Sequence, residues 1–406
     1  MVEFHKNTDE SLVPDYVLPD VLMTADGKKI ENAFDWIQTR RPEILALYKK
    51  VMYGNLPPRA VKTEFETISC KEDALNNTAV RKEIQLTFSM ADGKSHSFVM
   101  LLYIPKNLSA PAPVFVGLNF KGNQNCTSED DVMMTGRLLN GGLVANERSN
   151  QVQRWQFEET IKRGYASATV CYHDIYPDDK DENSWRNSVY NLFFADESNE
   201  EFHSHGSAIS AWAWGLSRML DCLETEPMID SSKAFVHGHS RLGKTSLWAG
   251  ANDTRFKLVI TNDSGCCGSA IARRDFGETV ENITHYFPHW FVSSFPKYSK
   301  REAELPFDQH FFVALTAPRY LAIASAELDS HADPKGEFLA GAHAGAVYKL
   351  FGIDTYTPDT PHPVDSYITG AVNYHVRSGG HDQNLADWTH YWDIAAKIKG
   401  FVLNID

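Results

Sequence analysis

The segment Gly-His-Ser-Arg-Leu-Gly-Lys at 238–244 contains the residue types that nucleophilic catalysis requires. Serine hydrolases often place the nucleophile on a strained strand-to-helix turn with a Gly-x-Ser-x-Gly pattern, because small neighbours let the backbone approach adjacent strands. Gly238 fits the first glycine position and Ser240 the nucleophile position. The second glycine position holds Leu242, with a glycine one residue later, so the match is partial. Ser240 is a candidate nucleophile, and the alternative is a serine that only caps the following helix.

Positive charge surrounds Ser240 at short range. Arg241 follows it directly, and Lys244 comes one helical turn later. The amides at the start of a helix stabilise negative charge in front of it, which suits the oxyanion formed during acyl transfer. A turn with a purely structural role does not require a guanidinium beside the serine. We therefore expect Arg241 to assist Ser240, while the alternative for Lys244 is a solvated helix residue.

His381 is the expected general base. It lies in Ser-Gly-Gly-His-Asp at 378–382, directly after the strand-like run 372–377. In hydrolases of the α/β class, the partners of the serine follow it along the chain in the order acid, then histidine. A histidine after two glycines occupies a flexible and exposed loop, unlike a histidine of a core. The alternative is a solvated loop residue without a catalytic role.

Two aspartates compete for the acid position. Asp329 and Asp263 each follow an apolar, strand-like run. Either carboxylate could orient the imidazole and stabilise its protonated form. Glu327 and Asp333 are further alternatives, each of which could instead be an ordinary capping or ion-pairing residue. The sequence favours Asp329 and leaves the choice open.

The pattern of apolar runs predicts the scaffold that positions these residues. The expected strands are 80–89 and 97–105, paired as a hairpin, and 114–120, 165–172, 235–237, 258–261, 320–326 and 372–377. The expected helices are 32–53, with Pro42 starting or kinking its second half, and 152–163, 208–223, 241–250 and 385–401. Strands that alternate with helices indicate an α/β fold, a three-layer sandwich with a mostly parallel central sheet. Ligands of such sheets bind at the carboxyl ends of the strands, where the candidate residues fall.

The chain of 406 residues shows no internal repeat or long linker, so we expect a single catalytic domain, with 1–27 as an extended N-terminal arm. Its formal net charge of −14 argues against nucleic acid or an anionic membrane as partner, because phosphate binding needs clustered lysine and arginine. No apolar run reaches membrane-spanning length, and the first thirty residues lack the apolar core of a signal peptide. His203 and His205 lack a carboxylate partner at helical spacing, so neither a metal nor another cofactor is expected.

With these residues assembled, the chain resembles the bacterial branch of the glucuronoyl esterases, carbohydrate esterase family 15. The resemblance extends from about Arg41 to the C-terminus, and a series of motifs in order is far more specific than one motif alone. The motifs are GLNFKG at 117–122, RGYA at 163–166, GHSRLGK at 238–244, NDSGCCG at 262–268, GET at 277–279, FPHWF at 287–291, DQH at 308–310, ADP at 332–334 and GGHD at 379–382.

The resemblance implies an α/β-hydrolase fold and hydrolysis of the esters that link 4-O-methyl-glucuronic acid of xylan to lignin alcohols. It implies Ser240 as nucleophile, His381 as base and Arg241 as a side-chain donor to the oxyanion. Asp263 matches the carboxylate position of some members and Asp329 that of others. Because both positions are filled, we expect the two aspartates to share the orienting role.

The resemblance also implies the surroundings of the substrate. Lys244 and Glu278 match family residues that hold sugar hydroxyls. The second residue after Asp329 is often a tryptophan that contacts the sugar, and here it is His331. Trp290 is either a sugar-stacking platform or a core aromatic. Glucuronoxylan or a lignin–carbohydrate ester is the implied partner, the implied location is secreted or periplasmic with any signal peptide removed, and we expect a monomer.

Two other interpretations remain at this point. The chain could be another carbohydrate esterase, of the acetyl-xylan type, with the same triad, although a small acyl pocket does not require Lys244 and Glu278 together. It could also be a non-catalytic carbohydrate-binding member. The presence of Ser240, His381 and two candidate acids argues against that.

Overall fold

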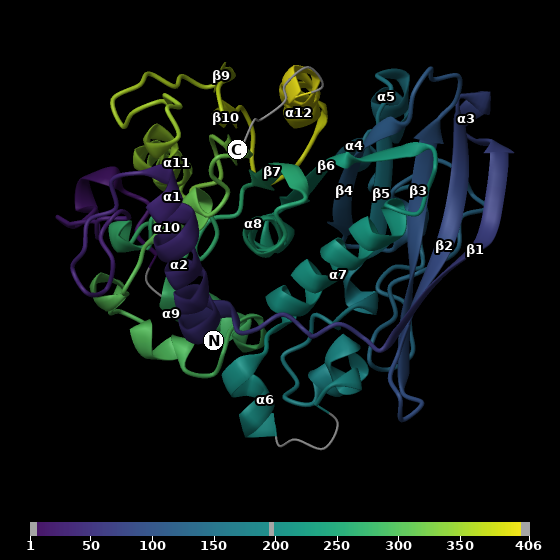
Figure 1. The fold of residues 1–406 in the computed structure, drawn as a ribbon, viewed down its shortest axis with the longest axis horizontal. Coiled ribbons are helices and arrows are strands. Elements are labelled where there is room, and N and C mark those ends of the chain that lie inside the picture. Colours follow the sequence, from purple (N-terminus) through teal and green to yellow (C-terminus); the bar gives the residue numbers. More distant parts are fainter. Residues whose placement is uncertain (1–5, 195–198, 399–406) are drawn as a thin grey trace.

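The computed structural model describes residues 6–194 and 199–398, within which ten strands form one mixed sheet (Figure 1). The strand order is β1-β2-β3-β5-β4-β6-β7-β8-β10-β9. The strands are β1 (Lys62–Asp73), β2 (Ala79–Ser89), β3 (Ser95–Pro105), β4 (Ala112–Asn119), β5 (Ala166–Cys171), β6 (Ile229–His239), β7 (Phe256–Asn262), β8 (Tyr320–Ala326), β9 (Ser366–Ile368) and β10 (Val372–Arg377). Strands β5, β4, β6, β7, β8 and β10 pair in parallel, and the strands outside this group pair antiparallel.

Helices cover both faces of the sheet, which confirms the predicted three-layer α/β fold. The α-helices of the described residues are α1 (Ala33–Asp35), α2 (Arg41–Tyr48), α3 (Ala74–Asn77), α4 (Val152–Trp155), α5 (Phe157–Lys162), α6 (Asn199–His205), α7 (Ala208–Leu223), α8 (Arg241–Asn252), α9 (Val280–Tyr286), α10 (Gln309–Ala314), α11 (Pro334–Leu350) and α12 (Leu385–Ile398). Among the described residues, no helix combines the length and apolar character needed to cross a membrane.

Strand β4 shows how the two faces are filled. All of its residues are buried, and successive side chains of a strand point to opposite faces. Val116 belongs to the core that contains Trp212 of α7. Phe115 belongs to the opposite core, where its ring centroid lies 5.4 Å from that of Trp388 in α12. A strand that is buried on both faces has a continuous apolar sequence, which is why this strand could be predicted.

Several elements differ from the predictions. Segment 152–163 forms two short helices, α4 and α5, because Gln156 between them adopts a left-handed conformation with φ +48°. Segment 32–53 is helical, but π-helical turns precede and follow α2, and Pro42 lies in the first turn of α2. Strand β6 is longer than 235–237, and the last residues of the predicted helix 385–401 lie outside the described residues. Strands β1 and β9 and helix α11 were not predicted.

The candidate residues meet at one edge of the sheet. Ser240 directly follows β6, Asp263 directly follows β7, Asp329 comes three residues after β8, and His381 comes four residues after β10. These four strands are neighbours and parallel, so their carboxyl ends lie side by side. The fold therefore brings together residues separated by as many as 141 positions in the sequence.

Candidate active site

Ser240 occupies a strained turn between β6 and α8. Its backbone has φ +59° and ψ −129°, a combination that side-chain-bearing residues rarely adopt and that is typical of functional turns. Its amide donates to the carbonyl of Asn262 (2.8 Å), which fixes the turn against β7. A Cβ on Gly238 would lie 2.0 Å from the carbonyl oxygen of Leu242, so only glycine fits there. Leu242 itself is buried, and its side chain is accommodated at the second glycine position of the motif.

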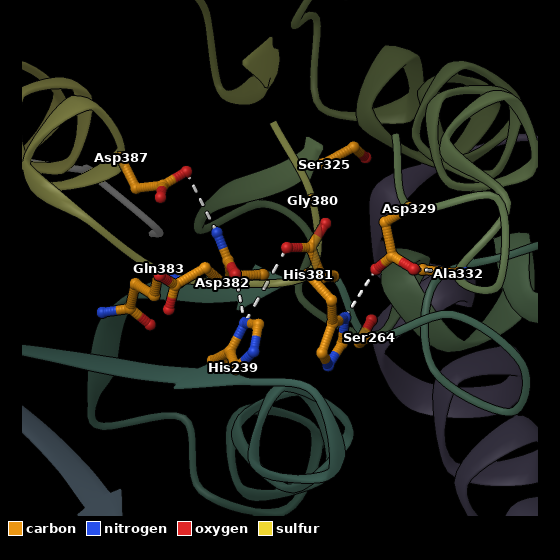
Figure 2. Close-up of polar contacts among 12 residues, drawn as sticks. His239, Ser264, Ser325, Asp329, Ala332, Gly380, His381, Asp382, Gln383 and Asp387 are labelled. Carbon is orange, nitrogen blue, oxygen red and sulfur yellow. Dashed lines mark hydrogen bonds and ion pairs between the residues drawn. The ribbon is translucent and has the colours of Figure 1, made fainter. Parts of the chain in front are cut away.

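His381 and Asp329 form a hydrogen-bonded pair at the same edge. Nδ1 of His381 lies 2.5 Å from Oδ2 of Asp329. The histidine side chain is 41% exposed and the aspartate side chain is 4% exposed, so the imidazole meets solvent while its partner is buried. Figure 2 shows His381 with Asp329 on one side and His239 on the other, and the two imidazole ring centroids lie 4.4 Å apart. This arrangement leaves the outer nitrogen of His381, Nε2, for proton transfer.

Arg377, the last residue of β10, shapes the loop that contains His381. Its guanidinium donates to the carbonyl oxygens of Gly380 (3.0 Å) and Asp382, the residues on either side of the histidine. Its Nε donates to Asp387 (2.9 Å), a fully buried carboxylate at the start of α12. The histidine loop is thus folded around a buried cation, which the sequence did not reveal because its contacts are mostly to backbone oxygens.

Asp263 lies close to the pair without joining it. An oxygen of Asp263, an oxygen of Asp329 and a ring nitrogen of His381 lie within 4.8 Å of one another. Both carboxyl oxygens of Asp263 are buried without a hydrogen bond to any described residue, and Arg377 approaches to 3.5 Å. Burial and the negative charges of Glu337 and Asp329 raise the pKa of Asp263 well above its usual range. The geometry assigns the contact with the imidazole to Asp329.

The other two acid candidates, Asp333 and Glu327, have different surroundings. Asp333 caps the start of α11 through the amide of Gly336 and accepts a hydrogen bond from Arg274 (2.8 Å). Glu327 is exposed to solvent.

Arg241 begins α8 beside Ser240, as the sequence indicates. Its guanidinium lies 4.7 Å from the ring centroid of Trp290 and 5.0 Å from that of Phe287, and it forms an ion pair with Asp178. Asp178 was not among the predicted site residues. The one available signal was its position shortly after the strand at 165–172, on the sheet edge where the other candidates lie.

Lys244, Glu278 and His331 lie near one another, and the charge of Glu278 also acts on Arg241. Lys244 is buried within α8, and His331 Nε2 lies 3.3 Å from Oε1 of Glu278. Burial alone would raise the pKa of Glu278, but the hydrogen bond from His331 and the positive charge of Lys244 outweigh it and lower that pKa. Lys6 Nζ lies 3.1 Å from His331 Nδ1. Since an ammonium group only donates, Nδ1 accepts and Nε2 carries the proton that contacts Glu278.

Trp290 is a buried residue in this arrangement. It is 3% exposed, its ring stacks on Phe287 with centroids 4.0 Å apart, and its indole N–H donates to Asp178 (2.7 Å). Of the two interpretations given above, these contacts favour a core aromatic over an open platform for a sugar.

Two places in the described structure contain residue types that bind metals. In residues 6–194 and 199–398, Asp263, Asp329 and His381 form a group with the spacing of metal ligands, but Nδ1 of the histidine already contacts Asp329. Nε2 of His203 lies 3.0 Å from the carbonyl oxygen of Glu182, so this nitrogen is engaged with backbone.

The chain is similar in sequence and in fold to known esterases. A family model described as "Glucuronyl esterase, fungi" matches residues 151–352. Carbohydrate esterase MZ0003, from an unknown prokaryotic organism, is 40% identical over 96% of this chain and 91% of that protein. The solved structure of a glucuronoyl esterase from Solibacter usitatus has a TM-score of 0.89 at 39% identity and covers 95% of this chain and 99% of that one. A structure described as a promiscuous CE15 esterase from the marine bacterial metagenome has a TM-score of 0.86 at 40% identity, over 97% of this chain and 99% of that one.

Proposed function

Because the chain belongs to carbohydrate esterase family 15, the glucuronoyl esterases, we propose that it hydrolyses 4-O-methyl-glucuronoyl esters that link glucuronoxylan to lignin alcohols. It is a carboxylic-ester hydrolase of the 4-O-methyl-glucuronoyl methylesterase type. The observation that supports the proposed mechanism is the strained turn of Ser240 at the same sheet edge as the hydrogen-bonded pair of His381 and Asp329.

In the proposed reaction, Ser240 attacks the ester carbonyl and His381 takes the serine proton. The same imidazole returns this proton to the departing alcohol, which leaves the uronoyl group as an ester on Ser240. Water then attacks that acyl-enzyme with His381 as base, the imidazolium returns the proton to the oxygen of Ser240, and the free uronic acid departs. Asp329 holds the imidazole in the tautomer that accepts at Nε2 and stabilises its charged form. Hydrolysis of methyl glucuronate, measured as the release of free acid, tests this reaction directly.

Arg241→Ala is expected to lower kcat far more than it raises KM. In the proposed mechanism the guanidinium donates to the oxyanion, which exists only in the transition state and the tetrahedral intermediate. One such donor is worth roughly 3 to 4 kcal/mol, or about 10^2 to 10^3 in kcat. Steady-state kinetics on methyl glucuronate measure the effects on kcat and on KM separately. Arg241→Lys should restore only part of the loss, because the ammonium group of lysine does not reproduce the planar arrangement of donors in a guanidinium. Equal affinity of the alanine variant and the wild type for a phosphonate transition-state analogue would contradict this role.

The pair of Lys244 and Glu278 is proposed to recognise the sugar. A cation and a carboxylate held close together can donate to and accept from vicinal hydroxyls. A site built to hydrogen-bond hydroxyls rejects the wrong epimer strongly, because the epimer leaves buried polar groups without partners. His331 stands where other members often carry tryptophan, and its contact with Glu278 supports a polar role for it in this chain.

Methyl glucuronate is therefore expected to be cleaved at least about tenfold faster than methyl galacturonate, since one misplaced hydroxyl costs on the order of 1.4 kcal/mol or more. Lys244→Ala and Glu278→Ala should each reduce this ratio of kcat/KM and leave hydrolysis of a small aryl ester nearly unchanged. His331→Trp should lower KM for glucuronate esters by adding a stacking surface. A ratio near one in the wild type would mean that the pocket does not recognise the sugar in this way.

A broader esterase is the second candidate function. The specific observation in its favour is the likeness to a protein described as a promiscuous esterase. Hydrolysis of an acetylated xylan as fast as that of methyl glucuronate would support this candidate over a dedicated glucuronoyl esterase. Labelling of Ser240 by a serine-directed organophosphonate separates both enzymes from a non-catalytic member, which would remain unlabelled.

A further inference from the structure

Asp178 is a loop residue whose buried carboxylate accepts hydrogen bonds from several side chains of the site. It lies after β5, beyond a short 3-10 turn at Tyr172–Asp174, and its side chain is 4% exposed. Oδ1 accepts from Nε2 of His289 (2.7 Å) and from the indole N–H of Trp290 (2.7 Å). Oδ2 accepts from the hydroxyl of Tyr172 (2.8 Å) and from Nη1 of Arg241. Both oxygens are fully engaged, so the carboxylate cannot rotate without breaking several bonds.

The charge of Asp178 is stabilised in spite of its burial. Burial by itself would raise the pKa of this carboxyl, but the hydrogen bond from His289 and the positive charge of Arg241 hold that pKa below its usual range. Burial would likewise lower the pKa of Arg241, and the charge of Asp178 raises it. Each of the two charges thus compensates for the desolvation of the other.

The contacts of Arg241 leave one end of its guanidinium available. Nη1 is bound to Asp178, Nε is buried without a hydrogen-bond partner, and the flat group packs near Phe287 and Trp290. Within the described residues, Nη2 has no hydrogen-bond partner, and the side chain as a whole is 26% exposed. Fixing Nη1 fixes the plane of the guanidinium, and therefore the direction in which Nη2 donates.

We propose that Asp178 is a positioning residue that aims Arg241 at the oxyanion. Trp290 and His289 act with it, since they hold the carboxylate from the opposite side. Donors contribute to catalysis when they are already oriented before the charge forms, so a loosely held arginine loses most of its effect through reorganisation. This inference rests on the proposed role of Arg241, and the experiment below separates the two.

A double-mutant cycle tests the proposal. In the wild-type background, Asp178→Asn should lower kcat on methyl glucuronate by about 10- to 100-fold with KM changed less than about threefold, a part of the loss expected for one oxyanion donor. In the Arg241→Ala background, the same substitution should change kcat by less than about threefold, because the residue it positions is gone. Additive effects would show that Asp178 acts independently of Arg241 and would overturn the proposal.

Asp174→Asn is the matched control. Asp174 is a neighbouring carboxylate of the same loop, and its oxygens accept from the backbone amides of Gly136 and Arg137. It should alter the melting temperature and leave the kcat of the folded enzyme unchanged. An equal loss of kcat in this variant would mean that loop disorder, rather than the aim of Arg241, explains the effect, and the proposal would fail.

Tyr172→Phe covers the case in which Asp178→Asn does not fold. It removes one donor to Oδ2 and keeps the carboxylate. We expect kcat to fall about 3- to 10-fold, which is part of the free energy of one hydrogen bond to a charged group. In the Arg241→Ala background the same substitution should leave kcat unaffected. If Arg241→Ala is itself silent, the oxyanion role fails and the positioning role falls with it. If Arg241→Ala is severe while Asp178→Asn and Tyr172→Phe are silent, only the positioning role is wrong.

Discussion

Ser240→Ala is expected to lower kcat for methyl glucuronate by about 10^3 to 10^6, the usual scale for a member of a catalytic triad. The acyl-enzyme cannot form without the hydroxyl, so water must attack the substrate directly. The residual activity should come from the oxyanion donors and from substrate binding alone. The hydrolysis of methyl glucuronate at saturating substrate measures this loss, and KM should change little.

The fold should survive this substitution. The turn is held by backbone contacts, since the amide of Ser240 donates to Asn262 and its carbonyl accepts from Gly243 (2.8 Å). Ser232→Ala is a suitable control, because Ser232 is an exposed serine of the same strand. Its kcat should equal that of the wild type. Turnover of Ser240→Ala within tenfold of the wild type would exclude this serine as the nucleophile.

Asp329→Asn should be the second most damaging change, with kcat lower by roughly 10^3 to 10^4. An amide in place of the carboxylate neither stabilises the imidazolium nor favours the tautomer that accepts at Nε2. Asp263→Asn should cost much less than Asp329→Asn, because Asp329 contacts Nδ1 of His381 while neither carboxyl oxygen of Asp263 has a hydrogen bond to a described residue. Kinetics of the two single variants and of the double variant decide between one acid and a shared role.

If the two aspartates share the role, each single variant loses less than the double variant, and Asp263→Asn is not silent. If Asp329 acts alone, Asp263→Asn in the Asp329→Asn background changes nothing further. Glu327→Gln provides the control, since Glu327 is an exposed carboxylate of the same loop. A severe Asp263→Asn beside a mild Asp329→Asn would reverse the assignment that the hydrogen bond to His381 supports.

The parts of the fold that the sequence predicted are those with continuous apolar runs. Strands such as β4 and β8 are buried on both faces, so their sequences need no partner to be recognised. Strand β1 was missed because it is mostly exposed and polar at the end of the sheet. The break at Gln156 was missed because no glycine or proline marks it, and a left-handed glutamine depends on tertiary contacts.

The residues of the candidate site likewise differ in whether the sequence alone could predict them. Ser240, Asp329 and His381 could be predicted as candidates because each lies within four residues of the end of a recognisable strand, and Ser240 and His381 belong to motifs of known chemistry. The choice between Asp329 and Asp263 could not be made, since both follow neighbouring strands and only the folded loop shows which oxygen meets Nδ1. The contacts of Asp178 could not be predicted for a further reason. Tyr172 lies six residues away, but Arg241 lies 63 and His289 111 residues away, so no local pattern indicates most of its partners.

The position of Lys6 has a consequence for how the protein is produced. Its Nζ contacts His331, whose other ring nitrogen contacts Glu278, and the carbonyl of Asn7 accepts from the amide of Gly277. An affinity tag fused ahead of Lys6 would join the chain beside the proposed sugar pocket. A run of tag histidines could then compete for the Glu278 carboxylate and alter KM without any change in the enzyme. Proteolytic removal of such a tag before kinetic measurements keeps the comparison between uronate esters free of this artefact.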